Sequence, residues 1–451
     1  MTDNDLLRRY GLFDAKVPRY TSYPPANHFV AGTGALHQRD FPAAVETDRP
    51  VSIYIHIPFC RRLCWFCACR TQGTRTMRPV EAYVDYLLQE IAQTRALLPE
   101  GVTMGRLHLG GGTPTILPPA VMARLLDGIF AAFPTAAPFE FSVEIDPTDA
   151  APDLLHLLLA RGMNRASIGV QDFAPQVQKA IGRPQSLAQT RKVVDQLRTG
   201  GLPSLNIDLL YGLPYQTPDS FRETLDNVVA MQPDRLAIFG YAHVPWMSKR
   251  QVVIPETALP GPERRFELAG MAHAILTAAG WQAIGIDHFA RPADPLAVAM
   301  AEGRVRRNFQ GYTDDDSAVL IGLGASAISR FPQGYVQNAV ATSAWQDRVV
   351  RGEPTGDKGY VLTPLDRVVA QMVEDLMCRF ALDSIDLGRR FPQQEAFIAE
   401  TLARLAKQFP GAIERRSNLL RLRPEARPLA RIMAHQIDAF ASEGPGYSTA
   451  I

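Results

Sequence analysis

The sequence of 451 residues predicts an α/β fold built on parallel strands, with an N-terminal extension and a mainly helical C-terminal domain. From about residue 51 to 290, short β-like runs alternate with amphipathic helical stretches, and this order favours a parallel sheet, either open or closed into a barrel. After about residue 355 the alternation stops and helical patterns dominate. We therefore expect an N-terminal segment at 1–35, a catalytic domain at 36–355 and a helical domain at 356–451.

Each element rests on its own pattern of apolar residues. Helical spacing predicts long helices between the strands, such as 79–98 and 262–280, and strand patterns predict the sheet. The predicted strands span 51–57, 105–110, 139–145, 165–171, 204–212, 234–242 and 282–287. In the last domain we expect helices at 364–383, 394–411 and 427–442, and a strand at 418–424.

Polar side chains gather where the predicted strands end. Glu144 lies near the end of one strand, Gln171 ends the next, Asp208 lies in the third, and Asp287 follows a later one. The carboxyl ends of parallel strands form the active-site mouth of (β/α) barrels. Any one of these residues is more simply explained as a turn or cap residue, but their recurrence on strand after strand favours a site.

Composition narrows the possible partners. Charged residues make up 21% of the chain and the net charge is +1, so there is no basic surplus of the kind that nucleic-acid or membrane binding needs. The longest nearly apolar run, 268–281, is too short to cross a bilayer and contains His273. Four of the five cysteines fall within ten residues, which is unlike a secreted disulfide framework and predicts a reducing cytoplasm.

The ten residues "CRRLCWFCAC" hold these four cysteines, Cys60, Cys64, Cys67 and Cys69. Clustered thiolates bind zinc or an iron–sulfur cluster. A structural zinc site usually needs a second ligand pair, and the nearest histidines do not complete a standard pattern. The C-x3-C-x2-C spacing after a hydrophobic strand suggests that three cysteines hold three irons of a [4Fe–4S] cube. The fourth iron would then stay open for a small ligand, as in a catalytic metal site.

The C-x3-C-x2-C loop resembles that of the radical S-adenosylmethionine (SAM) superfamily. Within it, the chain is similar to the oxygen-independent coproporphyrinogen III dehydrogenase family of haem synthesis over nearly its whole length. The resemblance rests on "PRYTSYP" (18–24), the cysteine segment 54–69, "GGGTPT" (110–115), "NIDLLYGLP" (206–214) and "RNFQGYT" (307–313). It implies a partial (β/α) radical-SAM barrel and an N-terminal segment that folds over the active site.

The resemblance also implies which residues bind the cofactors. Cys60, Cys64 and Cys67 would hold the [4Fe–4S] cluster, and Cys69 would not. One SAM would contact Tyr54, Gly111, Glu144 and Ile328. The family is described with a second SAM close by, whose neighbours would be Phe66, Gly112, Thr113, Gln171, Arg183, Asp208 and Ala242.

The implied reaction turns two propionates of coproporphyrinogen III into vinyl groups and gives protoporphyrinogen IX. A reductant such as a flavodoxin or ferredoxin would deliver the electron that starts SAM cleavage. Arginines suit the substrate carboxylates because their forked donors match them. The candidates are Arg19, Arg291, Arg306 and Arg307, and the candidate catalytic residues are Tyr54, Arg19 and Gln310. The family is described as monomeric.

Three alternatives differ in testable ways. Haem-chaperone-like relatives share the barrel and the three cysteines but generally lack "PRYTSYP" and the fourth cysteine, and an anaerobic haem-degrading methyltransferase fits the N-terminal segment less well. A non-enzymatic, metal-binding interaction protein would leave the polar strand ends unexplained.

The chain departs from the family pattern at Ala68, where glycine is usual, and at Arg70 and Gly240, where asparagine is more usual.

Overall fold

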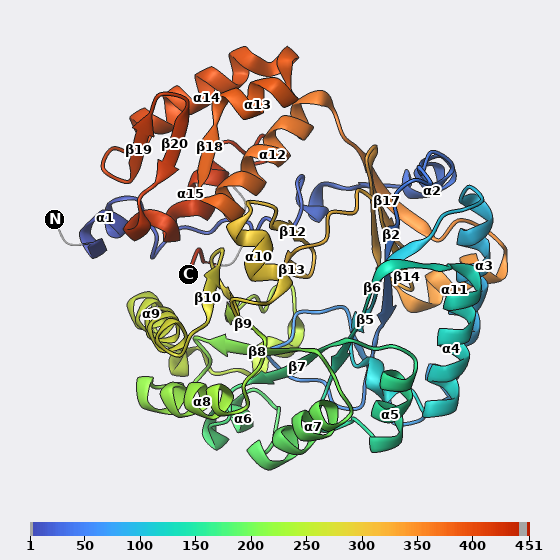
Figure 1. The fold of residues 1–451 in the computed structure, drawn as a ribbon. Helices are drawn as coiled ribbons and strands as arrows, with labels where there is room; N and C mark the ends of the chain where they lie inside the picture. Colours follow the sequence, from blue (N-terminus) through green and yellow to red (C-terminus); the bar gives the residue numbers. More distant parts are fainter. Residues whose placement is uncertain (1–2, 442–448) are drawn as a thin grey trace.

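The computed structural model describes residues 3–441 and 449–451 and shows one large twisted sheet with helices along its outer side (Figure 1). Seven neighbouring strands of this sheet are parallel, which confirms the predicted fold class. In spatial order these strands are β14 (Leu320–Leu323), β2 (Val51–Ile57), β5 (Met104–Gly111), β6 (Thr135–Ile145), β7 (Arg165–Gln171), β8 (Ser204–Tyr211) and β9 (Arg235–Gly240).

Antiparallel strands extend the sheet on both sides. Beyond β14 lie β15 (Ile328–Phe331), β16 (Gly334–Asn338), β17 (Gly356–Val361) and β1 (Val30–Ala31), and beyond β9 lie β11 (His288–Ala290) and β10 (Gln282–Ile284). Within the described residues, β1 and β10 end the sheet and do not pair with each other. The sheet is therefore a partial barrel.

Two strands have the predicted bounds, 51–57 and 165–171, and most others differ by a few residues at their ends. The expected parallel strand at 282–287 is wrong. β10 stops at Ile284 and pairs antiparallel with β11, which in turn pairs antiparallel with β9. Gly285, at φ +58°, begins the tight turn between them, so the apolar pattern that predicted one strand continues into a turn.

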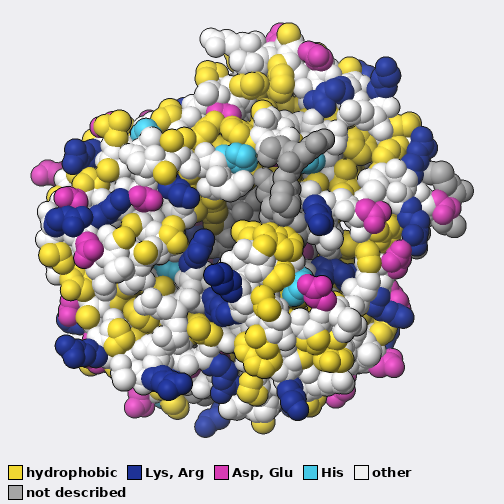
Figure 2. Space-filling model, turned by 180° about the vertical axis from the view of Figure 1, so that it is seen from behind, with side chains coloured by type: hydrophobic (Ala, Val, Ile, Leu, Met, Phe, Trp, Pro, Cys, Tyr) yellow, Lys and Arg dark blue, Asp and Glu magenta, His cyan; other side chains and the backbone are white. Residues whose placement is uncertain are grey.

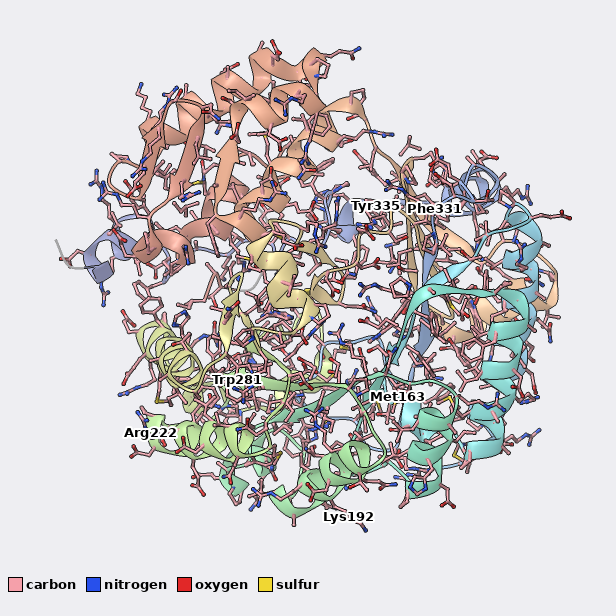
Figure 3. All side chains as sticks on the ribbon, in the orientation of Figure 1. Met163, Lys192, Arg222, Trp281, Phe331 and Tyr335 are labelled. Carbon is pink, nitrogen blue, oxygen red and sulfur yellow. The ribbon has the colours of Figure 1, made fainter. Side chains whose placement is uncertain are left out.

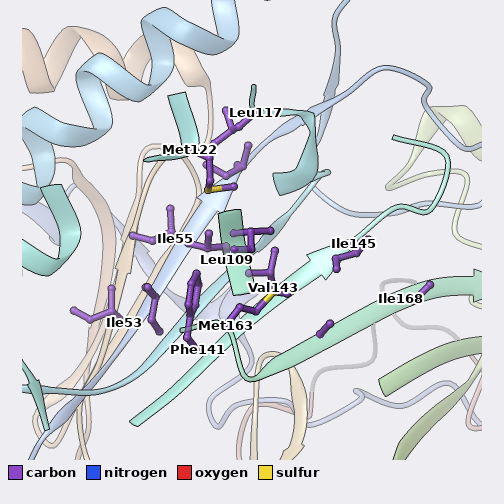
Figure 4. Close-up of a cluster of buried hydrophobic side chains, with 14 of the residues drawn as sticks. Ile53, Ile55, Leu109, Leu117, Met122, Phe141, Val143, Ile145, Met163 and Ile168 are labelled. Carbon is purple, nitrogen blue, oxygen red and sulfur yellow. The ribbon is translucent and has the colours of Figure 1, made fainter. Parts of the chain in front are cut away.

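The core lies between the sheet and the outer helices. Ile53 and Ile55 of β2, Leu109 of β5 and Phe141 of β6 are at most 1% exposed, and they pack with Met122 from the covering helix (Figure 4). Successive strand residues face opposite sides, so these residues point to the helices while their neighbours point to the concave face. Burying this apolar side fixes which residues are left to form a site.

The outer helices follow the strands in βα order. Proline at the first or second position starts most of them, where its missing N–H group costs no hydrogen bond. They are α3 (Arg78–Leu97), α4 (Pro119–Ala132), α5 (Pro152–Ala160), α6 (Pro175–Ala180), α7 (Leu187–Thr199), α8 (Pro218–Ala230), α9 (Pro262–Ala278) and α11 (Thr342–Val350). The predicted helices at 79–98 and 262–280 correspond to α3 and α9.

The last part of the chain has its own apolar core. Four helices, α12 (Pro364–Arg379), α13 (Ser384–Arg390), α14 (Glu395–Gln408) and α15 (Ala430–His435), pack with a three-stranded sheet of β18 (Ala381–Asp383), β20 (Leu419–Leu422) and β19 (Ile413–Arg416). The helix expected at 427–442 is shorter: a 3-10 helix, η6 (Pro424–Leu429), precedes α15, and residue 442 lies outside the described residues.

The N-terminal segment joins this C-terminal core. Leu6, Leu7, Tyr20 and Tyr23 are buried among residues of α12, α14 and α15, although more than 300 residues separate them in the sequence. Helix α1 (Asp3–Arg9) lies beside the C-terminal part in Figure 1, and α2 (Gly34–Ala43) lies beside β17. The three predicted domain ranges stay a prediction, and the main sheet continues to Val361, beyond the expected boundary at 355.

Short elements connect these parts. They are η1 (Ala26–His28), β3 (Phe59–Cys60), β4 (Gln72–Gly73), η2 (Pro114–Ile116), η3 (Lys249–Val253), η4 (Glu256–Ala258), α10 (Pro295–Ala301), β12 (Arg306–Asn308), β13 (Gly311–Thr313) and η5 (Pro392–Gln394). In the described part of the chain, no helix combines the length and the apolar character that crossing a membrane requires.

Candidate radical site

The concave face of the sheet is polar, in contrast to its helix-covered side. On β8, Leu205, Ile207 and Leu209 are fully buried, whereas Asn206 and Asp208 point the other way. Asn206 Nδ2 donates to Asp208 Oδ1 at 2.7 Å, and a hydroxyl of the neighbouring strand donates to Asp208 Oδ2. Burial raises the pKa of this carboxyl. The strands therefore place hydrogen-bonding groups inside a hollow.

A chain of polar contacts crosses β2, β5 and β6 near their carboxyl ends. His56 Nε2 lies 3.1 Å from the carbonyl oxygen of Arg70, which can only accept, so Nε2 carries the proton. His56 Nδ1 then accepts from the Tyr54 hydroxyl at 2.9 Å. The Tyr54 ring stacks on His108, with centroids 5.7 Å apart, and His108 Nε2 lies 3.3 Å from Glu144. Tyr54 is thus held from both sides.

Glu144 is the carboxylate at this edge of the sheet. Its Oε1 faces His108 and its Oε2 accepts from the Gly111 backbone N–H at 3.0 Å. Burial alone would raise the pKa of Glu144, but the hydrogen bonds from His108 and Gly111 outweigh it and lower the pKa. The side chain is still 41% exposed, so an ionised carboxylate faces the open side of the hollow.

The four-cysteine segment forms a loop across the carboxyl edge of the sheet. Strands β3 and β4 pair in parallel and bring Cys60 opposite Gly73, which closes the loop at its base. Backbone hydrogen bonds attach it to the end of β5: Gly112 N donates to Ile57 O at 2.8 Å, and Thr113 N donates to Phe59 O at 2.8 Å. The sheet therefore fixes where the loop begins and ends.

Each thiol predicted as an iron ligand has a polar neighbour. Thr113 Oγ1 lies 3.6 Å from Cys60 Sγ, and Arg183 Nη1 donates to Cys64 Sγ at 3.4 Å. The Cys69 backbone N–H donates to Cys67 Sγ at 3.4 Å. Hydrogen bonding from Cys69 lowers the pKa of Cys67 to about 6 and outweighs burial. The loop thus places a hydrogen-bond donor beside each of the three sulfurs, and at Cys67 these donors favour the thiolate, the form that binds metal.

The donor set fits an iron–sulfur cluster. Burial, with smaller contributions from the nearby thiols of Cys67 and Cys64, raises the pKa of Cys60 to about 11, so the three side chains face a common region. Among the described residues, no three His, Cys, Asp or Glu side chains gather closely enough to hold one metal ion between them. In an iron–sulfur cluster each cysteine thiolate binds a different iron.

Glycines let the end of β5 pass under this loop. Gly111 has φ +113°, and a Cβ atom there would lie 2.6 Å from the His56 ring. A Cβ atom at Gly112 would lie 2.6 Å from the Phe59 carbonyl oxygen. The run "GGGTPT" is therefore a close-packing feature, because only glycine allows these approaches.

The remaining predicted cofactor neighbours lie around the same edge. Arg183 Nη2 donates to Gly169 O at 2.7 Å, and its Nη1 lies 3.2 Å from Asp146, so it bridges β7 and the cysteine loop. Gln171 ends β7 in the left-handed conformation, at φ +71°. Phe66 and Ala242 both present carbonyl oxygens to Gln251 Nε2. Ile328 lies against Gly322, which pairs with Tyr54.

A second group of residues, which we call the arginine cluster, consists of Arg19, Arg307 and Arg431. Arg307 Nη2 donates to Arg19 O at 3.3 Å, and Arg431 donates to Val17 O at 2.7 Å and Pro18 O at 3.1 Å. Burial, together with repulsion from Arg19 and Arg307, lowers the pKa of Arg431 to about 9. These cations line the N-terminal "PRYTSYP" segment.

The cluster holds more positive charge than its neighbours neutralise. Asp287 is the carboxylate whose charge reaches all three arginines. Burial would raise the pKa of Asp287, but His288, Arg307 and Arg19 lower it to about 2. Arg307 Nε and Nη1 are buried without a hydrogen-bond partner among the described residues. A buried donor without a partner is costly, which is typical of a site that an anion completes.

The other predicted substrate residues lie elsewhere. Arg291 stacks on Trp281, with its guanidinium carbon 3.4 Å from the ring centroid, beside α9 (Figure 3). Arg306 faces Glu374 at 3.5 Å and is 43% exposed. Gln310 is exposed between β12 and β13. The sequence analysis missed Arg431, because its helical context gave no hint that it contacts residues 17 and 18.

A cavity of about 420 Å³ opens beside the arginine cluster, between the β12–β13 hairpin and α12. Its lining includes Tyr20, Tyr23, Arg306, Arg307, Arg330 and Tyr335. Tyr335, on β16, stacks on Phe29 with the ring centroids 5.1 Å apart (Figure 3). Aromatic walls with arginines at one side offer both apolar area and anion-binding donors.

Comparison with known proteins agrees with this geometry. Residues 54–228 match the Radical SAM superfamily. The chain is 48% identical, over the full length of both chains, to the oxygen-independent coproporphyrinogen III oxidase of Paracoccus denitrificans, and 49% identical, again over both full lengths, to that of Cereibacter sphaeroides. It superimposes on the solved coproporphyrinogen III oxidase of Escherichia coli, a radical SAM enzyme, with a TM-score of 0.88. The sequence identity is 37%, and the match covers 94% of this chain and 100% of that one.

The partial barrel and the three-cysteine loop at its carboxyl edge define a radical SAM enzyme, whose cofactors are a [4Fe–4S] cluster and SAM. Within that class, the sequence identity over the full length of both chains shows the family. The chain belongs to the oxygen-independent coproporphyrinogen III oxidase family. The superfamily and the family predicted from the sequence are both confirmed, whereas the roles of individual site residues stay predictions.

Proposed function

We infer that this chain converts coproporphyrinogen III to protoporphyrinogen IX without oxygen. The observation that carries this inference is the full-length identity of 48% to a curated oxidase of this name, in a chain whose fold holds a three-cysteine loop over a polar hollow. Each of two propionate side chains would lose one hydrogen atom, CO2 and one electron, and so become a vinyl group. When bound, the cluster and SAM supply the 5′-deoxyadenosyl radical that takes the hydrogen.

The cysteine loop would hold the cluster through Cys60, Cys64 and Cys67. Arg183 donates to Cys64 Sγ at 3.4 Å and keeps a cation beside the thiolates. Hydrogen bonds to cluster sulfurs and nearby charge tune the potential of an iron–sulfur cluster. Cys69 would stay unligated, and its backbone N–H, which donates to Cys67 Sγ, would instead orient that ligand.

The first SAM would lie between the loop and the carboxyl ends of β2, β5 and β6. Glu144, ionised and 41% exposed, can accept from an ammonium or from ribose hydroxyls. Tyr54 is oriented by its hydrogen bond to His56 and by the stacked His108, and Gly111 leaves room beside them. Ile328 would provide an apolar contact on the β15 side. Tyr54 is also the proposed catalytic residue at this position.

A second SAM would contact residues on the β7–β9 side of the hollow. Gln171, Arg183 and Asp208 come from neighbouring strands and loops, and Asp208 accepts from Ser167 and Asn206 at its closed side. The remaining proposed contacts, Phe66, Gly112, Thr113 and Ala242, belong to the cysteine loop, to the end of β5 and to the segment after β9. These four positions lie within segments that hydrogen bonds join to one another.

The arginine cluster would bind carboxylates of the substrate, which carries four. Arg307 offers two buried donors without partners, and Arg19 lies beside it on the N-terminal segment. Charge-assisted hydrogen bonds to carboxylates are the strong kind, and arginine makes them in pairs. Arg19 donates to Gly240 O at 2.7 Å, which connects the cluster to the end of β9. Gln310, at the tip of the hairpin, would complete the proposed catalytic set.

Three further properties belong to this proposal. An external protein of the flavodoxin or ferredoxin kind would supply the electron that starts each turnover. The chain would act as a monomer. It would work in the cytoplasm, where its five cysteines, all free in the structure, stay reduced.

The direct test uses anaerobically reconstituted protein with SAM, dithionite and coproporphyrinogen III. We expect equal release of methionine and 5′-deoxyadenosine, together with protoporphyrinogen IX, each followed by mass spectrometry. Without any 5′-deoxyadenosine, the radical reaction would be refuted. SAM cleavage without vinyl products would instead indicate a haem-chaperone-like relative, and iron binding with no SAM cleavage would indicate a metal-binding interaction protein.

A further inference from the structure

An apolar surface lies on the segment between β9 and α9. Four large hydrophobic side chains are exposed within eight residues of the chain, and two of them, Val252 and Val253, lie in the short helix η3. We call them the apolar patch: Trp246 (54% exposed), Met247 (66%), Val252 (72%) and Val253 (57%). Single exposed hydrophobic residues are ordinary, but contiguous exposed patches commonly mark interaction sites.

The patch is bonded to the outer side of the cysteine loop. Ser248, next to Met247, donates from its hydroxyl to the Cys67 carbonyl at 2.9 Å. Gln251, next to Val252, donates to the Phe66 carbonyl at 2.7 Å. Arg250 donates to the Cys69 carbonyl at 3.1 Å. This segment therefore contacts the cysteine loop at Cys67, a proposed cluster ligand, and at its neighbours Phe66 and Cys69.

Basic side chains surround the patch. Residues 58–80 and 242–255 together contain seven Lys or Arg residues and no Asp or Glu, although the net charge of the whole chain is only +1. Arg62, Arg70, Arg75, Arg78 and Lys249 are exposed. Two of the acidic residues near these segments have partners: Asp149 pairs with Arg61, and Glu256 with His243. Glu81, directly after residue 80, is exposed. Figure 2 shows one face of the molecule, on which hydrophobic side chains lie next to Lys and Arg side chains.

We propose that the apolar patch and its basic surroundings are the docking surface for an acidic, one-electron carrier protein. This inference rests on the proposed function, which needs one electron from outside for each SAM cleaved. The reduced carrier would lose one electron and the enzyme's cluster would gain it, with no bond made or broken. Charge complementarity speeds the association of such partners, and electron-transfer complexes use small interfaces.

The charge also argues against a second copy of this chain as the occupant. A symmetric dimer places the same surface against itself, so the cations of one copy would meet the cations of the other. Like charges opposed across an interface are unfavourable. An acidic partner is therefore the occupant that this surface selects.

The test compares two electron sources on the same reconstituted enzyme. The variants Lys249→Glu and Met247→Asp change exposed side chains of this surface. Lys192→Glu, on the distant outer helix α7 (Figure 3), is the matched control for charge reversal. We expect the two surface variants to raise the KM for reduced flavodoxin about tenfold at low salt, and to weaken its binding by a similar factor in calorimetric titration. The rate of 5′-deoxyadenosine formation with dithionite should stay unchanged, and Lys192→Glu should resemble the wild type.

The outcomes separate this inference from the proposed function. If the wild type forms no 5′-deoxyadenosine with dithionite, the proposed function fails, whereas flavodoxin binding can still be measured. If dithionite works and both surface variants bind and use flavodoxin like the wild type, the docking surface is elsewhere and the inference is overturned. A dimer in sedimentation experiments that Met247→Asp dissociates would also overturn it, because the patch would then bind another copy.

Discussion

The two ends of the parallel strands carry charged groups in opposite ways. At the amino ends, which we call the floor, every charge has a close partner: Arg106 lies 3.2 Å from Glu140, Arg165 lies 3.3 Å from Glu140, and Arg235 lies 2.7 Å from Asp294. At the carboxyl end of β6, Glu144 faces one histidine and one backbone N–H and is 41% exposed. The same strands are therefore closed at one end and open at the other.

This contrast separates structural from functional charge. The side chains of Arg235 and Asp294 are only 2% and 3% exposed, so the floor closes the hollow with ion pairs. Arg165 Nε and Arg235 Nη1 nevertheless lack a hydrogen-bond partner among the described residues. What distinguishes Arg307 from the floor arginines is that no carboxylate of the described residues lies within ion-pair distance of it, and its Nε and Nη1 also lack hydrogen-bond partners. Groups that are unmatched in the folded protein can bind a charged ligand without first breaking an internal pair.

The largest predicted effect is at the carboxyl end of the strands, in the cysteine loop. We expect Cys60→Ser, Cys64→Ser and Cys67→Ser each to lose the cluster, because each would remove one of three ligands. Iron content and visible absorption of anaerobically reconstituted protein measure the loss. The formation of 5′-deoxyadenosine should disappear with it.

The matched control lies two residues further along the same loop. Cys69→Ser should keep the iron content of the wild type, because its interaction with Cys67 Sγ comes partly from the backbone N–H, which the substitution leaves in place. Its turnover should fall. If Cys69→Ser also lost the cluster, the assignment of three ligands and one open iron would be wrong.

On the floor, the expected effect is on stability. Arg235→Met removes one partner of a buried pair and leaves Asp294 charged without compensation, which typically costs about 3–5 kcal/mol of unfolding free energy. Denaturant unfolding of the apoprotein measures it. Arg124→Met is the control, because Arg124 and Asp85 form an exposed pair worth about 0–1 kcal/mol. Equal losses in the two variants would contradict a special role for the floor.

The sequence predicted the fold well wherever local pattern decides structure. In "VSIYIHI", alternate residues point to opposite faces of β2. One face is buried under helices, and the other carries Tyr54 and His56. The prediction failed at 282–287, where a turn interrupts an apolar run. In the C-terminal part the strand expected at 418–424 is present as β20, whereas β18 and β19, of three and four residues, were not predicted. Strands of that length show little alternation.

The candidate site was predictable in part for a similar reason. Its loop and glycines are contiguous motifs, so the sequence shows them directly. The arginine cluster is not contiguous: Arg19 and Arg431 meet only because the N-terminal segment packs into the C-terminal core. The floor likewise joins Arg106 to Asp314, more than 200 residues away. Contacts at such separations follow from tertiary packing, which a single sequence does not display.

A smaller effect on the floor depends on pH. Burial would raise the pKa of Asp314, but Arg106 and Arg235 lower it to about 2, below its ordinary value of 3.8. The carboxylate therefore contributes stability above about pH 4, and this contribution, about 2 kcal/mol, is lost as the pH falls toward 2. Unfolding free energies measured from pH 5 to 3 should fall less steeply in Asp314→Asn than in the wild type. Parallel curves would show that this pair does not control the acid response.

The smallest predicted effect tests the unmatched donors. Arg307→Lys keeps the positive charge but removes the forked geometry, and with it the two buried donor nitrogens that now lack partners. If these groups bind a substrate carboxylate, the KM for coproporphyrinogen III should rise about tenfold, which corresponds to about 1.4 kcal/mol, while SAM cleavage without substrate stays unchanged. Arg291→Lys is the control, since Arg291 stacks on Trp281 away from the cluster. A KM that rises equally in both variants would place substrate recognition outside the arginine cluster and weaken the contrast between a matched floor and an unmatched site.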